Sequence, residues 1–137
     1  MKAIMYHYVR KFDPSLPNFR FLDVENFEKQ FNVIVLGDWN DDTKDESGEH
    51  CFDPFFIDDR FFFVTKEISK DIDQASYPKE PYVSFLDHIM ISKSLLKINS
   101  NYDVKTLLLG QYMGGYDVYE SYISDHLPVM LSFPVTN

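Results

Sequence analysis

The sequence predicts a domain that mixes β-strands with short helices, of the α/β or α+β class. Short apolar runs rich in β-branched and aromatic residues alternate with short amphipathic stretches, and no repeat or low-complexity tract interrupts them. A length of 137 residues gives room for one domain with a real core. A hydrophobic content of 45% and an aromatic content of 17% are typical of a globular protein.

The first part of the chain is expected to contain two strands separated by a loop and a short helix. Residues 3–9 (AIMYHYV) are β-branched and aromatic, as in a strand, and two prolines indicate a loop over 11–21. Asp23 is a candidate N-cap for a short helix in DVENFEKQF, residues 23–31. NVIVL, residues 32–36, is a short apolar run bounded by turn residues, which predicts a buried strand.

The rest of the chain is expected to alternate strands with short helical segments. The run DDTKDE, residues 41–46, follows the second strand and is expected to be a solvated acidic loop. The other expected elements are a strand over 60–65, a short helix over 67–75, a long strand over 82–92, a helical turn over 93–97, a strand over 104–110, a turn of helix over 116–123 and a closing strand over 127–133.

Charge and cysteine content limit the possible partners. The net charge of -9 and the pI near 4.7 oppose tight binding to a nucleic-acid backbone, which requires Lys and Arg. An anionic substrate would therefore need a divalent cation to supply positive charge. Cys51 is the single cysteine, which excludes an intrachain disulfide and a Cys-based metal cluster. Without a secretory signal or a long apolar span, we expect a cytoplasmic protein that does not associate with a membrane.

Acidic, amide and imidazole side chains stand at the end of three apolar runs, or inside them. They are Asp38 and Asn40 in VIVLGDWND, Asp87 and His88 in SFLDHIMIS, and Asp125 and His126 in YISDHLPVML. Carboxylates are hard ligands suited to Mg²⁺ or Mn²⁺, and a histidine oriented by a carboxylate acts as a base or stabilises a phosphoryl oxygen. A carboxylate inside an apolar strand costs several kcal/mol unless it is paired, so Asp87 is expected to have a partner such as His126.

In this order the three segments resemble the C-terminal half of the endonuclease/exonuclease/phosphatase superfamily, which includes DNase I-like nucleases, sphingomyelinases and inositol phosphatases. GDWND resembles its Gly-Asp-x-Asn motif, FLDHIMIS its Asp-containing strand, and SDHLPV its closing Ser-Asp-His-x-Pro motif. The resemblance implies half of a four-layer αββα sandwich over residues 32–137, with one mixed sheet and short helices on one face. It also implies a metal-dependent phosphoester hydrolase that uses Mg²⁺ or Mn²⁺.

The resemblance assigns a role to each matching residue. Asp38 would orient or activate the attacking water, and Asn40 would contact the transferring phosphoryl group. His126 would contact the phosphate or act as acid and base, with Asp87 as its hydrogen-bonded orienting partner. Asp125 would lie in the metal shell.

The chain upstream of these motifs follows a different pattern. IMYHYVR and PNFRFLDVENFEKQF resemble the opening of NodB-type polysaccharide deacetylases, but that family's Thr-Phe-Asp-Asp and His-x-x-x-His metal motifs are absent. The metal-binding Glu of the phosphoesterase superfamily is not matched either, because Glu25 and Glu28 fall in the predicted helix rather than at a strand end. We therefore expect a deacetylase-like segment over 1–31 joined to the half-domain over 32–137.

Several functions remain open on the sequence alone. The leading one is hydrolysis of a small phosphoester rather than of a long nucleic acid, impaired by the missing N-terminal half. The alternative is a non-catalytic remnant or interaction module, and polysaccharide deacetylation ranks last because its metal triad is absent. Asp38 and Asn40 also have an ordinary interpretation as turn residues. A half-sandwich exposes an apolar sheet face, which predicts a homodimer unless residues 1–31 cover that face.

Overall fold

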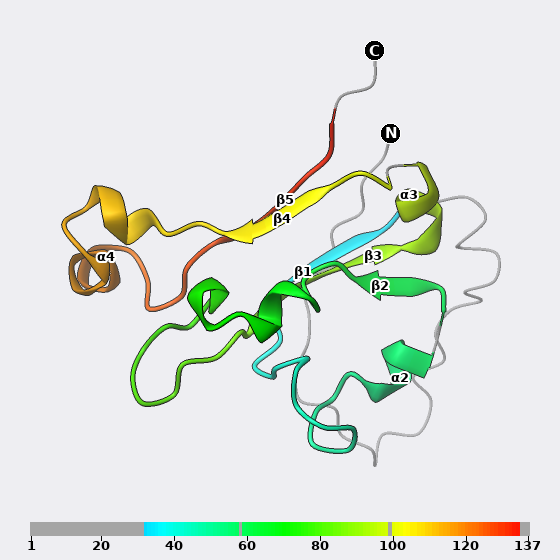
Figure 1. The fold of residues 1–137 in the computed structure, drawn as a ribbon, viewed down its shortest axis with the longest axis horizontal. Coiled ribbons are helices and arrows are strands. Elements are labelled where there is room, and N and C mark those ends of the chain that lie inside the picture. Colours follow the sequence, from blue (N-terminus) through cyan, green and yellow to red (C-terminus); the bar gives the residue numbers. More distant parts are fainter. Residues whose placement is uncertain (1–31, 58, 99, 135–137) are drawn as a thin grey trace.

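A computed structural model of the protein describes residues 32–57, 59–98 and 100–134 (Figure 1). In chain order its elements are β1 (Ile34–Asp38), α2 (Asp53–Ile57), β2 (Phe61–Phe63), η1 (Ile68–Lys70), η2 (Ile72–Gln74), β3 (Asp87–Ser92), α3 (Lys93–Ile98), β4 (Asp103–Thr106), η3 (Leu109–Tyr112), α4 (Tyr116–Tyr122) and β5 (Val129–Ser132), where η marks a 3₁₀ helix. This mixture belongs to the α+β class, as predicted. The deacetylase-like segment 1–31, with its expected strand and helix, lies outside the described residues.

The described strands form two antiparallel sheets. The first has the order β1-β3-β2, and the second is the pair β4-β5. The expectation of one mixed sheet is therefore wrong for this part of the chain. Parallel neighbours need a crossover of a dozen or more residues, whereas α3 begins at Lys93, directly after β3 ends at Ser92. The helix leads the chain away from the first sheet, and β4 starts a second one (Figure 1).

The central strand β3 explains why both faces of the first sheet are covered. Every residue from His88 to Ser92 is buried, and successive side chains point to opposite faces. Met90 belongs to one buried cluster, while Ile89 and Ile91 belong to another. A strand that is apolar on both faces requires a core on each side of its sheet.

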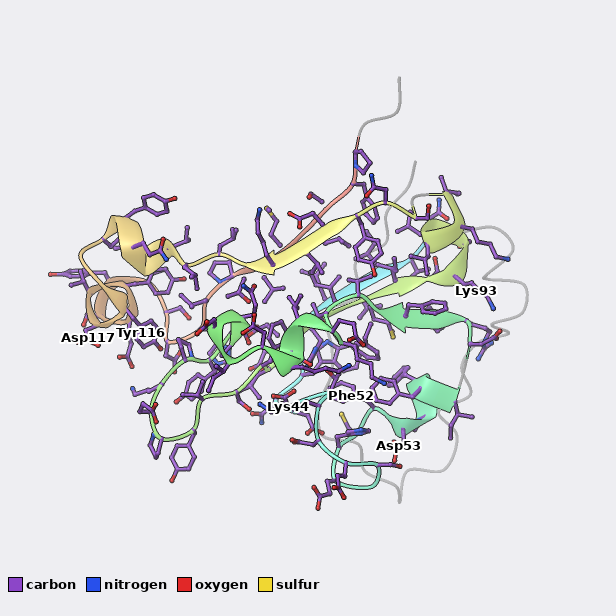
Figure 2. All side chains as sticks on the ribbon, in the orientation of Figure 1. Lys44, Phe52, Asp53, Lys93, Tyr116 and Asp117 are labelled. Atoms are coloured by element: carbon purple, nitrogen blue, oxygen red, sulfur yellow. The ribbon has the colours of Figure 1, made fainter. Side chains whose placement is uncertain are left out.

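Aromatic side chains form the core on one face. The cluster contains Trp39, Phe52, Phe63 and Met90, and Phe55 and Phe56 of the α2 region pack against it. The rings of Phe52 and Phe63 lie 5.0 Å apart in an edge-to-face arrangement. Figure 2 shows Phe52 and Asp53 at the start of the α2 segment, on the side of the sheet away from β4 and β5.

Aliphatic side chains form the core on the other face. Val64, Ile89, Ile91 and Leu95 make up this cluster, and residues of both β4 and β5 pack against it. Leu95 comes from α3, so helices contribute to both faces, and the expectation of helices on one face only is wrong. The physical reason is the two-sided burial of β3, which leaves no face of the sheet polar.

Several expected elements are shorter than the sequence suggested. The helix expected over 67–75 is two 3₁₀ turns, because the Asp71 carboxylate accepts the N–H of Asp73 and turns the backbone between them. The strand expected from residue 82 begins only at Asp87. The strand expected over 104–110 ends at Thr106, whose N–H and hydroxyl both donate to Gln74.

The gap between the two sheets is an open apolar groove of about 480 Å³. Ile34, Leu36 and Ile89 line it from the first sheet, and Met130 and Leu131 line it from β5. Leu36 is 42% exposed there, which is high for a strand leucine. None of the helices within the described ranges is both long enough and apolar enough to cross a bilayer.

Candidate functional site

The candidate site begins where β1 ends and β3 starts. Asp38 is the last residue of β1 and Asp87 the first of β3, and the antiparallel register makes them direct partners. Side chains of such partners lie on one face, with Cβ atoms about 4.5–5.5 Å apart. The two strands therefore bring two predicted site residues, 49 positions apart in the sequence, to one sheet end.

Asp38 and Asn40 also form a turn. The Asp38 Oδ1 atom accepts the N–H of Asn40 at 2.8 Å, and Asn40 has a φ of 52°. Asparagine tolerates this left-handed backbone better than most residues, and the hydrogen bond is that of an Asx-turn. The ordinary interpretation of these two residues as turn formers is thus part of the structure, and both side chains are exposed.

His126 meets Asp87 at this sheet end. Its Nδ1 atom lies 2.7 Å from Asp87 Oδ2, and the side chains of His126 and Asp87 are 26% and 22% exposed. His126 is therefore the partner that was expected for Asp87, and solvent still reaches its imidazole. Because a carboxylate only accepts, Nδ1 carries the proton in this contact. The neutral imidazole then has its lone pair on Nε2, to which none of the described residues donates a hydrogen bond.

The helix α4 and the residues after it hold the backbone of His126. Tyr119 is buried, and its hydroxyl donates to the His126 carbonyl at 3.1 Å. The His126 N–H donates to Ser124 Oγ at 3.0 Å. The ring of Tyr77 lies 5.2 Å from the imidazole, tilted by 55°. Two neighbours from the stretch just before the histidine therefore hold its backbone, and Tyr77, from a separate segment, packs against its ring.

Asp125 is exposed beside His126, and its contact is made through the backbone. Tyr116 donates its hydroxyl to the Asp125 carbonyl at 2.7 Å. Burial, together with the Glu120 and Asp125 carboxylates, raises the pKa of Tyr116, which keeps the phenol protonated as a donor. Figure 2 places Tyr116 at one end of the molecule and Lys93 of α3 near the other, so this contact lies at the α4 end.

The described residues do not form a complete metal site. No group of three or more His, Cys, Asp or Glu side chains in the described ranges is arranged to hold a metal ion. Asp38, Asp87 and Asp125 therefore do not act as a resident three-ligand set in this part of the chain. Mg²⁺ is often held by one or two carboxylates together with water and substrate phosphates. Among the described residues, this is the only type of Mg²⁺ coordination that Asp38, Asp87 and Asp125 fit.

His88, which receives no role from the motif resemblance, lies on the opposite face from its neighbour Asp87. It is fully buried, and burial lowers its pKa. Its Nε2 atom lies 3.2 Å from the Asp41 carbonyl, and its Nδ1 atom lies 3.0 Å from Thr65 Oγ1. The side chains of Asp87 and His88 thus point to opposite faces of the sheet, and only Asp87 belongs to the candidate site.

Two residues that the sequence analysis did not select also contact the site. Ser76 is fully buried beneath Asp87, and Tyr77 packs on His126. Their short stretch, ASYP, has no motif or periodicity that marks it. What marks these two residues is visible only in the structure, where Ser76 contacts Asp87 and Tyr77 contacts His126.

Comparisons with protein-family models, with curated proteins and with solved structures find no match to this chain. The resemblance to the endonuclease/exonuclease/phosphatase superfamily therefore stays a prediction. It depends on three short motifs, and the structure brings together one residue from each of them, Asp38, Asp87 and His126, at the β1–β3 end.

Proposed function

We propose that the chain carries part of a phosphoester-hydrolysing site at the end of β1 and β3. The observation that supports this most is the 2.7 Å contact between His126 Nδ1 and Asp87 Oδ2, in a pair that solvent reaches. Asp87 orients the imidazole, and Nε2 takes a proton from a nucleophile or returns one to a leaving group. Such proton transfer contributes about 10²–10⁴-fold to a hydrolytic rate.

Asp38 and Asn40 complete the proposed polar set. One carboxylate oxygen of Asp38 accepts the Asn40 N–H, and the other makes no hydrogen bond to any described residue. That second oxygen is available to orient a water molecule. The exposed Asn40 amide is available to contact a phosphoryl oxygen. These roles come from the motif resemblance and are compatible with the positions of the two residues.

Mg²⁺ or Mn²⁺ remains part of the proposal as the source of positive charge that an acidic chain lacks. When bound, the ion would neutralise charge on the phosphoryl oxygens. The exposed Asp125 carboxylate is the residue proposed to contact it. Because the described residues do not complete a metal site, no step of the proposed chemistry passes through the ion.

A non-catalytic remnant or interaction module is the second candidate. The observation in its favour is that no three-ligand metal group forms within the described ranges. The two candidates differ in metal binding, since a remnant has no saturable Mg²⁺ site. Titration calorimetry with MgCl₂, repeated on Asp125→Asn, measures this directly. A saturable signal that Asp125→Asn weakens supports the hydrolase, and heats of dilution alone support the remnant.

The proposed substrate is a small phosphoester rather than a long nucleic acid, acted on in the cytoplasm. The net charge of -9 supports this choice because few cations are available to displace counterions along a phosphate backbone. The proposed partner is a second copy of the chain. The exposed apolar groove between the sheets supports that pairing.

The decisive experiment is hydrolysis of bis(p-nitrophenyl) phosphate with Mg²⁺ or Mn²⁺, with and without EDTA. We expect metal-dependent turnover in the parent and a loss of about 10²-fold or more in His126→Ala. His126→Gln is the matched variant, because its amide still donates to Asp87 but transfers no proton. Both variants should lose activity while circular dichroism shows the parent fold. Equal background rates in the parent, the variants and the EDTA samples would leave the remnant as the function.

A further inference from the structure

The segment that precedes β3 contacts both members of the His126–Asp87 pair. Ser76 is fully buried, and its Oγ atom accepts the N–H groups of Leu86 at 2.9 Å and of Asp87 at 3.0 Å. Its carbonyl accepts the N–H of Leu127, the residue after His126, at 2.7 Å. One buried serine therefore joins the backbone at Asp87 to the backbone beside His126.

The next residue adds a side-chain contact. The ring of Tyr77 lies 5.2 Å from the His126 ring. Two backbone hydrogen bonds of 2.9 Å between Tyr77 and Ser84 hold the tyrosine in an isolated antiparallel bridge. Tyr77 thus packs against the imidazole from a fixed backbone position. Ser76 holds the backbone of Asp87 and of Leu127, the residue next to His126.

We propose that Ser76 and Tyr77 are the positioning residues of the His126–Asp87 pair. Serine suits this position because its small hydroxyl oxygen offers two lone pairs, and two N–H groups occupy them. Alanine would leave both buried donors without an acceptor. The Asp87 backbone would then shift, and the carboxylate would no longer hold the proton of His126 on Nδ1. The kinetic part of this inference rests on the proposed hydrolysis, whereas the proton position does not.

The test is to determine the tautomer of the His126 imidazole by ¹⁵N NMR of the whole chain. In the parent we expect neutral His126 to give separate signals for a protonated Nδ1 and an unprotonated Nε2, the state that the Asp87 contact favours. In Ser76→Ala we expect this single tautomer to be lost, with both nitrogens shifting toward averaged values. If the parent hydrolyses bis(p-nitrophenyl) phosphate, kcat should also fall roughly tenfold to a hundredfold.

Ser69→Ala is the matched control. Ser69 is also buried, and its hydroxyl lies 2.9 Å from both Thr43 Oγ1 and the Lys66 carbonyl, without contact to the pair. It should lower stability and leave the His126 tautomer unchanged. Should Ser76→Ala fail to fold, Tyr77→Leu tests the same segment, since it keeps the backbone bonds and removes the ring. Its expected result is partial loss of the single tautomer.

Two results would overturn the proposal. One is a folded Ser76→Ala, or a folded Tyr77→Leu where the alanine variant does not fold, whose His126 signals match the parent. The other is a Ser69→Ala variant that changes those signals as much as the Ser76 variant does. A parent without hydrolytic activity but with the predicted tautomer, lost in Ser76→Ala, would reject the proposed function and retain the positioning role.

Discussion

Asp42 is a buried carboxylate within a run of acidic residues. It is 3% exposed, and its Oδ2 atom lies 3.0 Å from both the Phe85 N–H and the Lys44 ammonium group. Its Oδ1 atom accepts the Lys44 N–H at 3.0 Å. The expectation of a solvated loop over residues 41–46 is therefore wrong for Asp42 and for Thr43, which is also buried. Asp42 thus joins the loop after β1 to Phe85, just before β3, and Thr43 joins it to Ser69 of η1.

We predict that Asp42→Ala lowers the free energy of unfolding by about 2–3 kcal/mol, because the buried Phe85 N–H loses its acceptor and the Lys44 contacts are lost as well. Asp42→Asn keeps one acceptor oxygen and should cost less. Asp45→Asn, an exposed change in the same run, should alter stability by less than about 0.5 kcal/mol. Urea unfolding followed by tryptophan fluorescence measures all three, since Trp39 lies next to the loop. An Asp42→Ala variant as stable as Asp45→Asn would show that the contacts contribute nothing.

At the scale of elements, His88 joins three segments through its two ring nitrogens. Because the Asp41 carbonyl only accepts, Nε2 carries the proton, and the Thr65 hydroxyl donates to Nδ1. The imidazole therefore links β3 to the loop after β1 and to the residues after β2. Burial lowers its pKa, and the favourable effect of the Asp42 carboxylate on the charged form offsets burial only in part.

The buried position of His88 predicts that the free energy of unfolding falls when the pH is lowered below about 6.5. Above the unfolded-state pKa of about 6.5, His88 is neutral in both states and adds no pH dependence. Below it, the unfolded state takes up a proton that the folded state excludes, so stability falls by up to about 1.4 kcal/mol per pH unit until the lowered folded pKa is reached. His88→Gln keeps a donor and an acceptor without titrating. Urea unfolding between pH 7.5 and 5 should show a steeper decline for the parent, and equal slopes would contradict the prediction.

The elements that the sequence predicted well are those whose signal is local. The apolar runs at β1, β3 and β5 are strands near the expected positions, and the KSLLK turn is α3. The helix α2 was missed, although Asp53 and Pro54 in its first turn are typical of a helix start. The positions of Ser76 and Asp42 depend on strand pairing between residues distant in sequence. A local sequence pattern does not show which distant strands pair. For the same reason, the division into two sheets could not be predicted.

At the scale of the whole molecule, the apolar groove and the net charge act in opposite directions on self-association. Leu36 of the edge strand β1 is 42% exposed in the groove, and residues of β5 also line it. Burying such a surface against a second copy is favourable in proportion to its apolar area. The charge of -9 on each copy opposes the approach. Salt screens that repulsion and leaves the hydrophobic contribution in place.

We therefore predict a dimer that becomes tighter as salt is raised. Sedimentation velocity of the full chain at micromolar concentrations should show a larger dimer fraction at 0.5 M than at 0.05 M NaCl. Leu36→Glu adds a charge to the groove and should give a monomer at both salt concentrations. Tyr122→Glu is the matched control, because Tyr122 is 79% exposed on α4 and does not line the groove. A parent that stays monomeric at both salt concentrations would contradict the pairing. A dimer that Tyr122→Glu disrupts as fully as Leu36→Glu would place the interface on α4 instead.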